Sequence, residues 1–246
     1  MKKLVTRLVL SCCLLAAAWA RADVVNVYTG ANAAPLMLAD GRGLYPDLVA
    51  YLNRHKVGGH TYVLRFIPRK RLQVKLEEGT LDGLVIGMTP EWLADPRQTK
   101  YLWSAPFDAD RFALVSLASR PIKPGSPRAL AGASIGLTAG YVYPGLEQWF
   151  ASAGLIANAG VSDEKNIEKL LLGRVDCVLV GESIVRYFMK THKLQHKLRV
   201  YAMPGPVSER RFMAQRSQQA IYEQLAPAIA ALKSDPNWQR IAAAYK

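Results

Sequence analysis

Two stretches of the chain repeat one pattern of polar and apolar positions. In the first, an amphipathic run ends at Gly79, and Asp82 then opens the uncharged apolar segment 84–87. In the second, the run ends at Gly173, and Asp176 opens another apolar segment. Glycine tolerates the positive φ at which many helices end, and a short uncharged run is typical of a strand buried on both faces. The pattern therefore predicts two helix-to-strand units, one in each of two similar α/β lobes.

The rest of the chain also alternates between strand-like and helix-like patterns. The expected strands are 24–28, 62–67, 84–87, 112–117, 134–137 and 175–180. The expected helices are 48–52, 68–78, 146–153, 166–172 and 182–190, followed by a helical tail, 218–245, that breaks at Asp235-Pro236. We place a crossing between the lobes at the Pro- and Gly-containing segment 120–125. This alternation predicts parallel sheets with both faces covered by helices.

The first 22 residues have the pattern of a targeting segment. Basic residues precede the apolar run 8–18, and Ala20-Arg21-Ala22 supplies a cleavage pattern before Asp23. This arrangement predicts a secretory signal peptide, 1–22, and export of the remainder to the periplasm. A lipoprotein signal that ends at Cys12 is the alternative. No later segment reaches the roughly 18 uncharged apolar residues that a transmembrane helix requires.

Charge and cysteine content narrow the classes of partner. Lysine and arginine number 32 against 19 acidic residues, and such an excess suits nucleic acid, an anionic surface or an acidic ligand. Nucleic acid is not expected, because no zinc-finger, helix-turn-helix or RNA-binding signature is present. Basic residues gather between Arg65 and Lys75, either on a solvated helix face or for ligand capture. Cys177 is the one cysteine after the signal, so no internal disulfide is possible; it is either a buried apolar residue or a reactive thiol.

Two motifs that suggest catalysis or metal binding lack the context that such chemistry needs. Ser134 has the glycine spacing of a nucleophile elbow, but the apolar strand follows the serine instead of preceding it. His192 and His196 have a metal-ligand spacing, but lysines surround them and no acidic residue lies nearby. We therefore expect no catalytic residue, no metal and no cofactor.

Polar and small residues at the ends of the predicted strands are better candidates for a site. Ligands of open α/β sheets bind beyond the carboxyl ends of the strands. Asn32 follows the first strand, Gly87, Met88 and Thr89 follow the third, and Gly140-Tyr141-Val142-Tyr143 follows the first strand of the second lobe. Exposed backbone N–H groups with a hydroxyl suit a carboxylate. The alternative is that these are ordinary turn residues.

At this point the residues resemble a known family, the periplasmic solute-binding proteins of the amino-acid type (family 3). Residues 76–82 are similar to its L-x-x-G-x-x-D signature, and 173–176 to its G-R-x-D signature. Residues 43–48 are similar to its glycine–aromatic–x–x–acidic–Leu helix start, and Thr89, Glu91, Arg97 and 103–107 to its "T-x-E-R … F-S-x-P-Y" block. The resemblance covers nearly all of the chain after residue 22.

The resemblance implies a two-lobed venus-flytrap fold (type II) with a ligand cleft between the lobes. Lobe 1 would comprise 23–116 plus 212–246, and lobe 2 would comprise 117–211. The implied function is capture of a small polar, carboxylate-bearing solute, such as an amino acid or an organic anion, by a non-enzymatic protein. Its implied partner is an ABC-type permease or a sensor subunit in the membrane, and we expect a monomer.

The family's binding roles transfer to some positions and not to others. Gly87, Thr89, Tyr141 and Val142 match positions that hold the ligand in the family. Arg97 corresponds to its carboxylate-binding arginine, but this chain has three extra residues before it. The acid that binds an α-amino group aligns with Gly181, with Glu182 beside it, and Arg69 replaces a stacking aromatic. With Arg71 nearby, these departures favour an anionic solute over a standard amino acid.

Two other functions share this fold. An orphan sensory domain would bind the same kind of solute for a membrane receptor. Cyclohexadienyl dehydratases also resemble these binding proteins, and Glu182 would be the candidate acid if burial raised its pKa.

Overall fold

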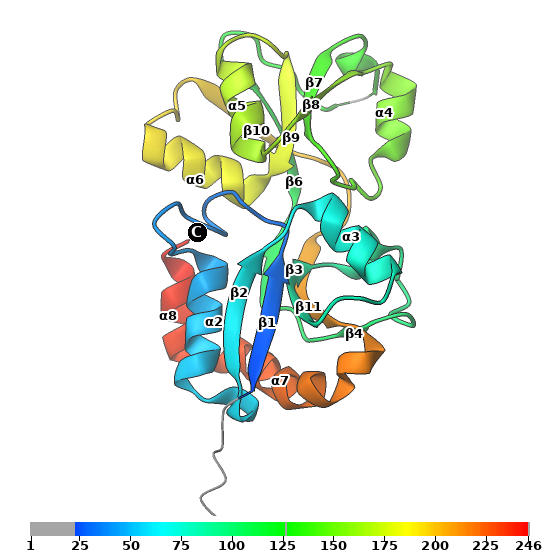
Figure 1. The fold of residues 1–246 in the computed structure, drawn as a ribbon. Coiled ribbons are helices and arrows are strands. Elements are labelled where there is room, and N and C mark those ends of the chain that lie inside the picture. Colours follow the sequence, from blue (N-terminus) through cyan, green and yellow to red (C-terminus); the bar gives the residue numbers. More distant parts are fainter. Residues whose placement is uncertain (1–22, 126, 246) are drawn as a thin grey trace, which may run out of the picture.

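The structure, a computed structural model, describes residues 23–125 and 127–245; the expected signal peptide lies outside the described residues. Two sheets dominate it and lie at opposite ends of the molecule (Figure 1). We call the part built on the first sheet lobe 1 and the part built on the second sheet lobe 2. Both ends of the described chain lie in lobe 1 (Figure 1). No helix in the described ranges is long and apolar enough to cross a bilayer.

The sheet of lobe 1 has the order β2-β1-β3-β11-β4, with β5 paired to β11. Its strands are β1 (Val24–Thr29), β2 (Thr61–Phe66), β3 (Gly83–Met88), β4 (Leu102–Trp103), β5 (Asp108–Asp110) and β11 (Ser208–Ala214). The first three are parallel, whereas β11 runs antiparallel to β3. Helices α2 (Leu44–Arg54), α7 (Gln219–Ala231) and α8 (Pro236–Ala243) bury one face, and α3 (Arg69–Glu77) buries the other.

The sheet of lobe 2 has the order β10-β6-β9-β7-β8. Its strands are β6 (Phe112–Leu117), β7 (Ser134–Thr138), β8 (Ile156–Gly160), β9 (Cys177–Gly181) and β10 (Leu198–Ala202). β7 is parallel to β8 and β9, and β6 is antiparallel to both β9 and β10. Helices α5 (Asp163–Leu171) and α6 (Glu182–His192) cover one face, and α4 (Glu147–Ala153) packs on the other.

Short-range signals explain where several helices begin. The Ser162 hydroxyl accepts a hydrogen bond from the Lys165 N–H at the start of α5, and Asp235 accepts from the N–H groups of residues 237 and 238 at the start of α8. Such side chains satisfy N–H groups that have no partner inside the helix. Pro236 at the first helical position completes the predicted break at 235–236.

The sequence predicted six of the strands within about two residues, but five others were missed: β4, β5, β8, β10 and β11. β8 forms an exposed edge and contains two alanines, an asparagine and a glycine, so it has little of the β-branched character that marks strands. β10 is short and interrupted by Arg199, and the first four residues of β11 are polar or charged. β4 and β5 have two and three residues, too few for a periodic pattern. The parallel pairing expected from the alternation is confirmed for β1, β2 and β3 and for β7 and β9, whereas β6 and β11 run antiparallel to their neighbours.

The chain crosses between the lobes at Arg111, between β5 and β6, and returns through the segment 203–207 between β10 and β11. The crossing predicted at 120–125 was wrong, because that segment joins elements within lobe 2. Its two prolines and its glycine mark a break in the chain, and such breaks also occur inside a lobe. The lobe boundaries expected from the sequence, at 116–117 and 211–212, fall inside β6 and β11. A division of the chain into lobes at these two positions stays a prediction.

Candidate functional site

A cavity lies between the two lobes, where the chain crosses from one to the other. Its volume is about 40 Å³, counted as the space that the centre of a water molecule can occupy. This is enough for water or for part of a small ligand. Residues at or just beyond the carboxyl ends of β1, β3, β7 and β9 line it: Thr29 to Ala31, Ile86 to Met88, Tyr141, Val142 and Gly181. This is the position at which open α/β sheets bind ligands.

Arg69 brings a positive charge to this cavity from the first turn of α3. Its guanidinium lies over the Trp92 ring, 5.4 Å from the ring centroid, and donates to the Met88 sulfur at 2.8 Å. Among the described residues, no carboxylate forms an ion pair with it. Burial therefore lowers the pKa of Arg69 below its ordinary value. A guanidinium held in this way has donors to spare for an anion.

Arg210 approaches the same Trp92 ring, 5.8 Å from its centroid, but its charge is already balanced. It lies 3.0 Å from an Asp110 oxygen and 3.4 Å from an Asp108 oxygen, and its side chain is almost fully buried. It also donates to the Tyr45 hydroxyl at 3.3 Å. Burial opposes the charge of Arg210, whereas the Tyr45 hydroxyl and the two aspartates together raise its pKa.

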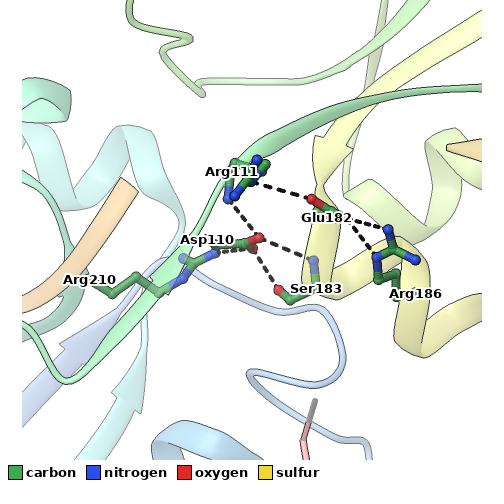
Figure 2. Close-up of polar contacts among 6 residues, drawn as sticks. All are labelled: Asp110, Arg111, Glu182, Ser183, Arg186 and Arg210. Atoms are coloured by element: carbon green, nitrogen blue, oxygen red, sulfur yellow. Dashed lines mark hydrogen bonds and ion pairs between the residues drawn. The ribbon is translucent and has the colours of Figure 1, made fainter. Parts of the chain in front are cut away.

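Asp110 connects the two lobes at the crossing. Figure 2 shows its carboxylate between the Arg210 guanidinium and Ser183 at the start of α6. The Ser183 hydroxyl donates to it at 2.6 Å, and the Ser183 N–H donates at 3.2 Å. Beside it, Glu182 pairs with Arg111 and with Arg186 (Figure 2). The start of α6 is thus tied to strand β11 of lobe 1 through one buried carboxylate.

Two glycines leave the space that this network needs. A Cβ at Gly87, where φ is +80°, would lie 2.1 Å from the Tyr45 hydroxyl oxygen. A Cβ at Gly181 would lie 2.8 Å from an Asp110 oxygen. Real Cβ atoms do not approach other atoms so closely, so a side chain at either position would displace the groups that hold Arg210. The carboxylate of Asp110 therefore occupies the space beside the position where the family resemblance places an acid.

Lobe 2 contributes a negative charge and two tyrosines. Asp163, at the start of α5, is 2% exposed and lines the cavity. Its carboxylate accepts a hydrogen bond from the Thr138 hydroxyl at 2.5 Å. Burial raises the pKa of Asp163 to about 6, although the Thr138 hydrogen bond and the charge of Arg210 act in the opposite direction. Tyr141 also lines the cavity, and burial raises its pKa well above the ordinary value.

Five residues predicted from the sequence line the cavity: Arg69, Gly87, Met88, Tyr141 and Val142. Thr89 is buried at the end of β3 and Tyr143 within the core of lobe 2, and neither is part of the lining. Arg71 and Arg97 are exposed and lie outside the lining. Asn32 lines a different groove, beside Glu164 and His192. Glu182 forms ion pairs outside the lining, so its carboxylate is not poised as an acid in this cavity.

Several cavity residues were not singled out by the sequence, among them Trp92, Asp110, Asp163 and Arg210. Arg210 lies in a strand that the pattern did not reveal, and Asp110 lies at an unpredicted crossing. Asp163 follows a helix cap, where an acidic residue is usually explained by the helix dipole. No local signal distinguished the three charged residues from ordinary surface charges.

The other chemical motifs have structural roles. The Ser134 hydroxyl donates to Asp176 at 2.7 Å, and burial raises the pKa of the Cys177 thiol to about 12, which leaves it protonated at neutral pH. The His192 ring stacks on Phe188, with centroids 4.0 Å apart. Within residues 23–125 and 127–245, no group of three or more His, Cys, Asp or Glu side chains is placed to hold a metal ion.

Solved structures share the fold of this chain, although no protein-family model and no curated protein matches its sequence. An ancestral arginine-binding protein bound to arginine is similar over 90% of this chain and 97% of its own, with 18% identity and a TM-score of 0.74. A substrate-binding protein of an ABC uptake transporter from Streptococcus pneumoniae, with bound histidine, covers 90% and 92%, with 17% identity and a TM-score of 0.72. The VFT2 domain of Bordetella pertussis BvgS covers 91% and 93%, with 17% identity and a TM-score of 0.69. The chain therefore has the two-lobed venus-flytrap fold of periplasmic amino-acid-binding proteins, as the resemblance of its motifs implied.

Proposed function

We propose that the chain is a non-enzymatic solute-binding protein of the periplasm, which captures a small carboxylate-bearing solute between its lobes for an ABC-type permease. The observation that carries the proposal is the guanidinium of Arg69. It is held against Trp92 in the cavity between the lobes and has no carboxylate partner among the described residues. A partly buried cation at such a site is stabilised when an anion binds.

The geometry around Arg69 suits a carboxylate in particular. Gly30 and Arg69 both line the cavity, and a Cβ at Gly30 would lie 3.6 Å from Arg69 atoms, so Gly30 lies beside the start of α3. The walls supplied by Leu36, Ile86 and Ile184 are apolar, and an apolar surrounding strengthens charge-assisted hydrogen bonds. A few charge-assisted hydrogen bonds in such a cavity, each worth about 1.5–3 kcal/mol, approach the roughly 5.5 kcal/mol that moves a two-state hinge from mostly open to mostly closed.

A thermal-shift screen tests the proposal, with small carboxylates in one group and polyamines without a carboxylate in the other. Carboxylates should stabilise the protein, by about 2.7 kcal/mol at 100 times the dissociation constant. Arg69→Gln should abolish the effect, whereas Lys75→Gln on the same helix should keep it. Stabilisation by polyamines alone, or full binding by Arg69→Gln, would contradict the proposal.

A further inference from the structure

Asp163 is a second charged group in the same cavity, contributed by the other lobe. It occupies the first turn of α5, directly after the capping residue Ser162, and its side chain is buried. The start of a helix stabilises a carboxylate through the helix dipole and free N–H groups. Helix capping alone, however, does not require burial of that carboxylate against a cavity that also contains Arg69.

The charge of Asp163 has no cationic partner in contact. Within the described ranges its side-chain donor is Thr138, and no lysine, arginine or histidine forms an ion pair with it. Arg210 attracts it from a distance, but that guanidinium is held by Asp110 and Asp108. A buried carboxylate in this situation is stabilised by a donor from outside the protein or by a proton of its own.

The groups that act on Asp163 come from every side of the cavity. Asp110 on β5 and Glu164 on α5 repel its charge, and Arg210 on β11 attracts it. Tyr141 and Tyr143, in the loop after β7, interact with it electrostatically. Tyr141 also interacts with Arg69, so its ring lies within the influence of both charges. Burial is the main cause of the raised pKa of Asp163, which lies near 6.

We propose that Asp163 is a specificity-determining residue, which decides what the solute carries at the end away from its Arg69-bound carboxylate. This inference rests on the proposed function of the cavity. A hydrogen-bond donor at that end satisfies the free acceptors of Asp163. A second carboxylate is repelled by it, unless Asp163 takes up a proton and becomes a donor. Binding of a dicarboxylate is therefore coupled to proton uptake by the protein, whereas binding of an amine-bearing carboxylate is not.

The test compares matched probes by titration calorimetry at about pH 7.5 and about pH 5.5, on either side of the Asp163 pKa. The probes are succinate with 4-aminobutanoate, and glutarate with 5-aminopentanoate. At the higher pH the wild type should bind the amine-bearing probes at least about tenfold more tightly. At the lower pH the dicarboxylates should gain up to about tenfold per pH unit for one coupled proton, and the preference should shrink.

Asp163→Asn is the decisive variant, because it keeps the shape of the side chain and removes its titration. It should bind dicarboxylates at the higher pH as well as the wild type does at the lower pH. Titration of the probes themselves persists in the variant, so the difference between the two proteins belongs to Asp163. Glu168→Gln, on the exposed side of α5, is the matched control and should behave as the wild type does.

Thr138→Val supplies a test that does not depend on how Asp163→Asn folds. Loss of the Thr138 donor should raise the pKa of Asp163 further, and the pH midpoint of dicarboxylate binding should rise with it. Failure of every probe to bind the wild type at either pH would contradict the proposed function and this inference together. Probe binding with the same preference and pH profile in wild type, Asp163→Asn and Thr138→Val would overturn this inference alone.

Discussion

Arg210 and Arg69 lie against the same tryptophan ring, yet their surroundings differ. Arg210 is enclosed by Asp108, Asp110 and the Tyr45 hydroxyl, and this cluster ties the crossing strand to α6. Arg69 has the Trp92 ring and a sulfur atom as neighbours and no carboxylate partner in the described parts of the chain. A buried charge that is paired maintains the structure, whereas one left unpaired costs stability unless a ligand compensates it.

Within one cavity, the contrast distinguishes a residue expected to stabilise the fold, Arg210, from residues proposed to bind the ligand. The charge of Arg210 is balanced by protein groups without a ligand, so substitution of Arg210 should lower the stability of the fold. The Arg69 and Asp163 side chains each form no ion pair within the described residues, so their removal should change ligand binding more than folding. Four measurements in the absence of ligand test the contrast, and they are arranged here from the largest expected effect to the smallest.

Arg210→Met should cause the largest loss of stability. The substitution removes the cation that pairs with the buried Asp110 carboxylate, and loss of one partner of a buried ion pair typically costs about 3–5 kcal/mol. Urea denaturation of the variant and the wild type would measure the loss. Arg240→Met, at an exposed arginine of α8, is the control. A loss below about 1 kcal/mol would remove the distinction between the two cavity arginines.

The unpaired state of Asp163 should appear as a dependence of stability on pH. Its folded pKa, about 6, lies above the roughly 3.9 of an unfolded aspartate. The native state therefore binds a proton at Asp163 more tightly than the unfolded state does. The resulting contribution to the free energy of unfolding is full below about pH 4 and is lost as the pH rises through 6. The loss is about 2–3 kcal/mol. Asp163→Asn should lack this fall in denaturation measured across the range; an unchanged profile would contradict the assignment.

Gly87→Ala should disturb the Arg210 cluster without touching a charge. The new Cβ would meet the Tyr45 hydroxyl, and the backbone φ of +80° disfavours any side chain, so we expect a loss of about 2–3 kcal/mol. Gly41→Ala is a matched control, because its φ is +81° and no atom lies within 4 Å of its Cβ position. The difference between the two variants isolates the cost of displacing Tyr45. Equal losses would mean that the close approach has no consequence.

Arg69→Met should have the smallest effect on stability. Removal of an unpaired, partly buried cation relieves its desolvation, so stability should stay unchanged or rise by up to about 1 kcal/mol. Urea denaturation in a buffer free of carboxylates is the measurement. A loss of about 2 kcal/mol or more would show that Arg69 supports the fold as Arg210 does, and the proposal for the cavity would lose its basis.

Local patterns predicted the repeated part of the fold well. Apolar strands β1, β3, β7 and β9 are short and free of charge, and glycines mark the helix ends before two of them. These features depend on neighbouring residues alone, so one sequence suffices. β11 is different, because its charged residues acquire partners that lie about 100 residues away in the chain. No periodicity within the strand encodes such partners.

The site was predictable to the same extent. Backbone-defined positions such as Gly87 and Tyr141 follow from the ends of strands, and the structure places them at the cavity. The predicted arginine of the family motif, Arg97, lies at an exposed position instead. Asp110 and Arg210 are assembled by the crossing of two distant segments, and Asp163 by the packing of α5 toward the cavity. Contacts between segments so far apart in the chain cannot be predicted from local sequence patterns.

The position of β11 also constrains the order in which the molecule can fold. β11 lies between β3 and β4 in the sheet of lobe 1, although all of lobe 2 separates it from them in the chain. The strands of lobe 2, from β6 to β10, are contiguous and can pair without any other segment. Lobe 1 must keep an incomplete sheet, with the edge of β3 open and β4 without its partner strand, until residues 208–214 arrive. Open edges of this kind are exposed to wrong pairing, so chain segments synthesised early depend on one synthesised late.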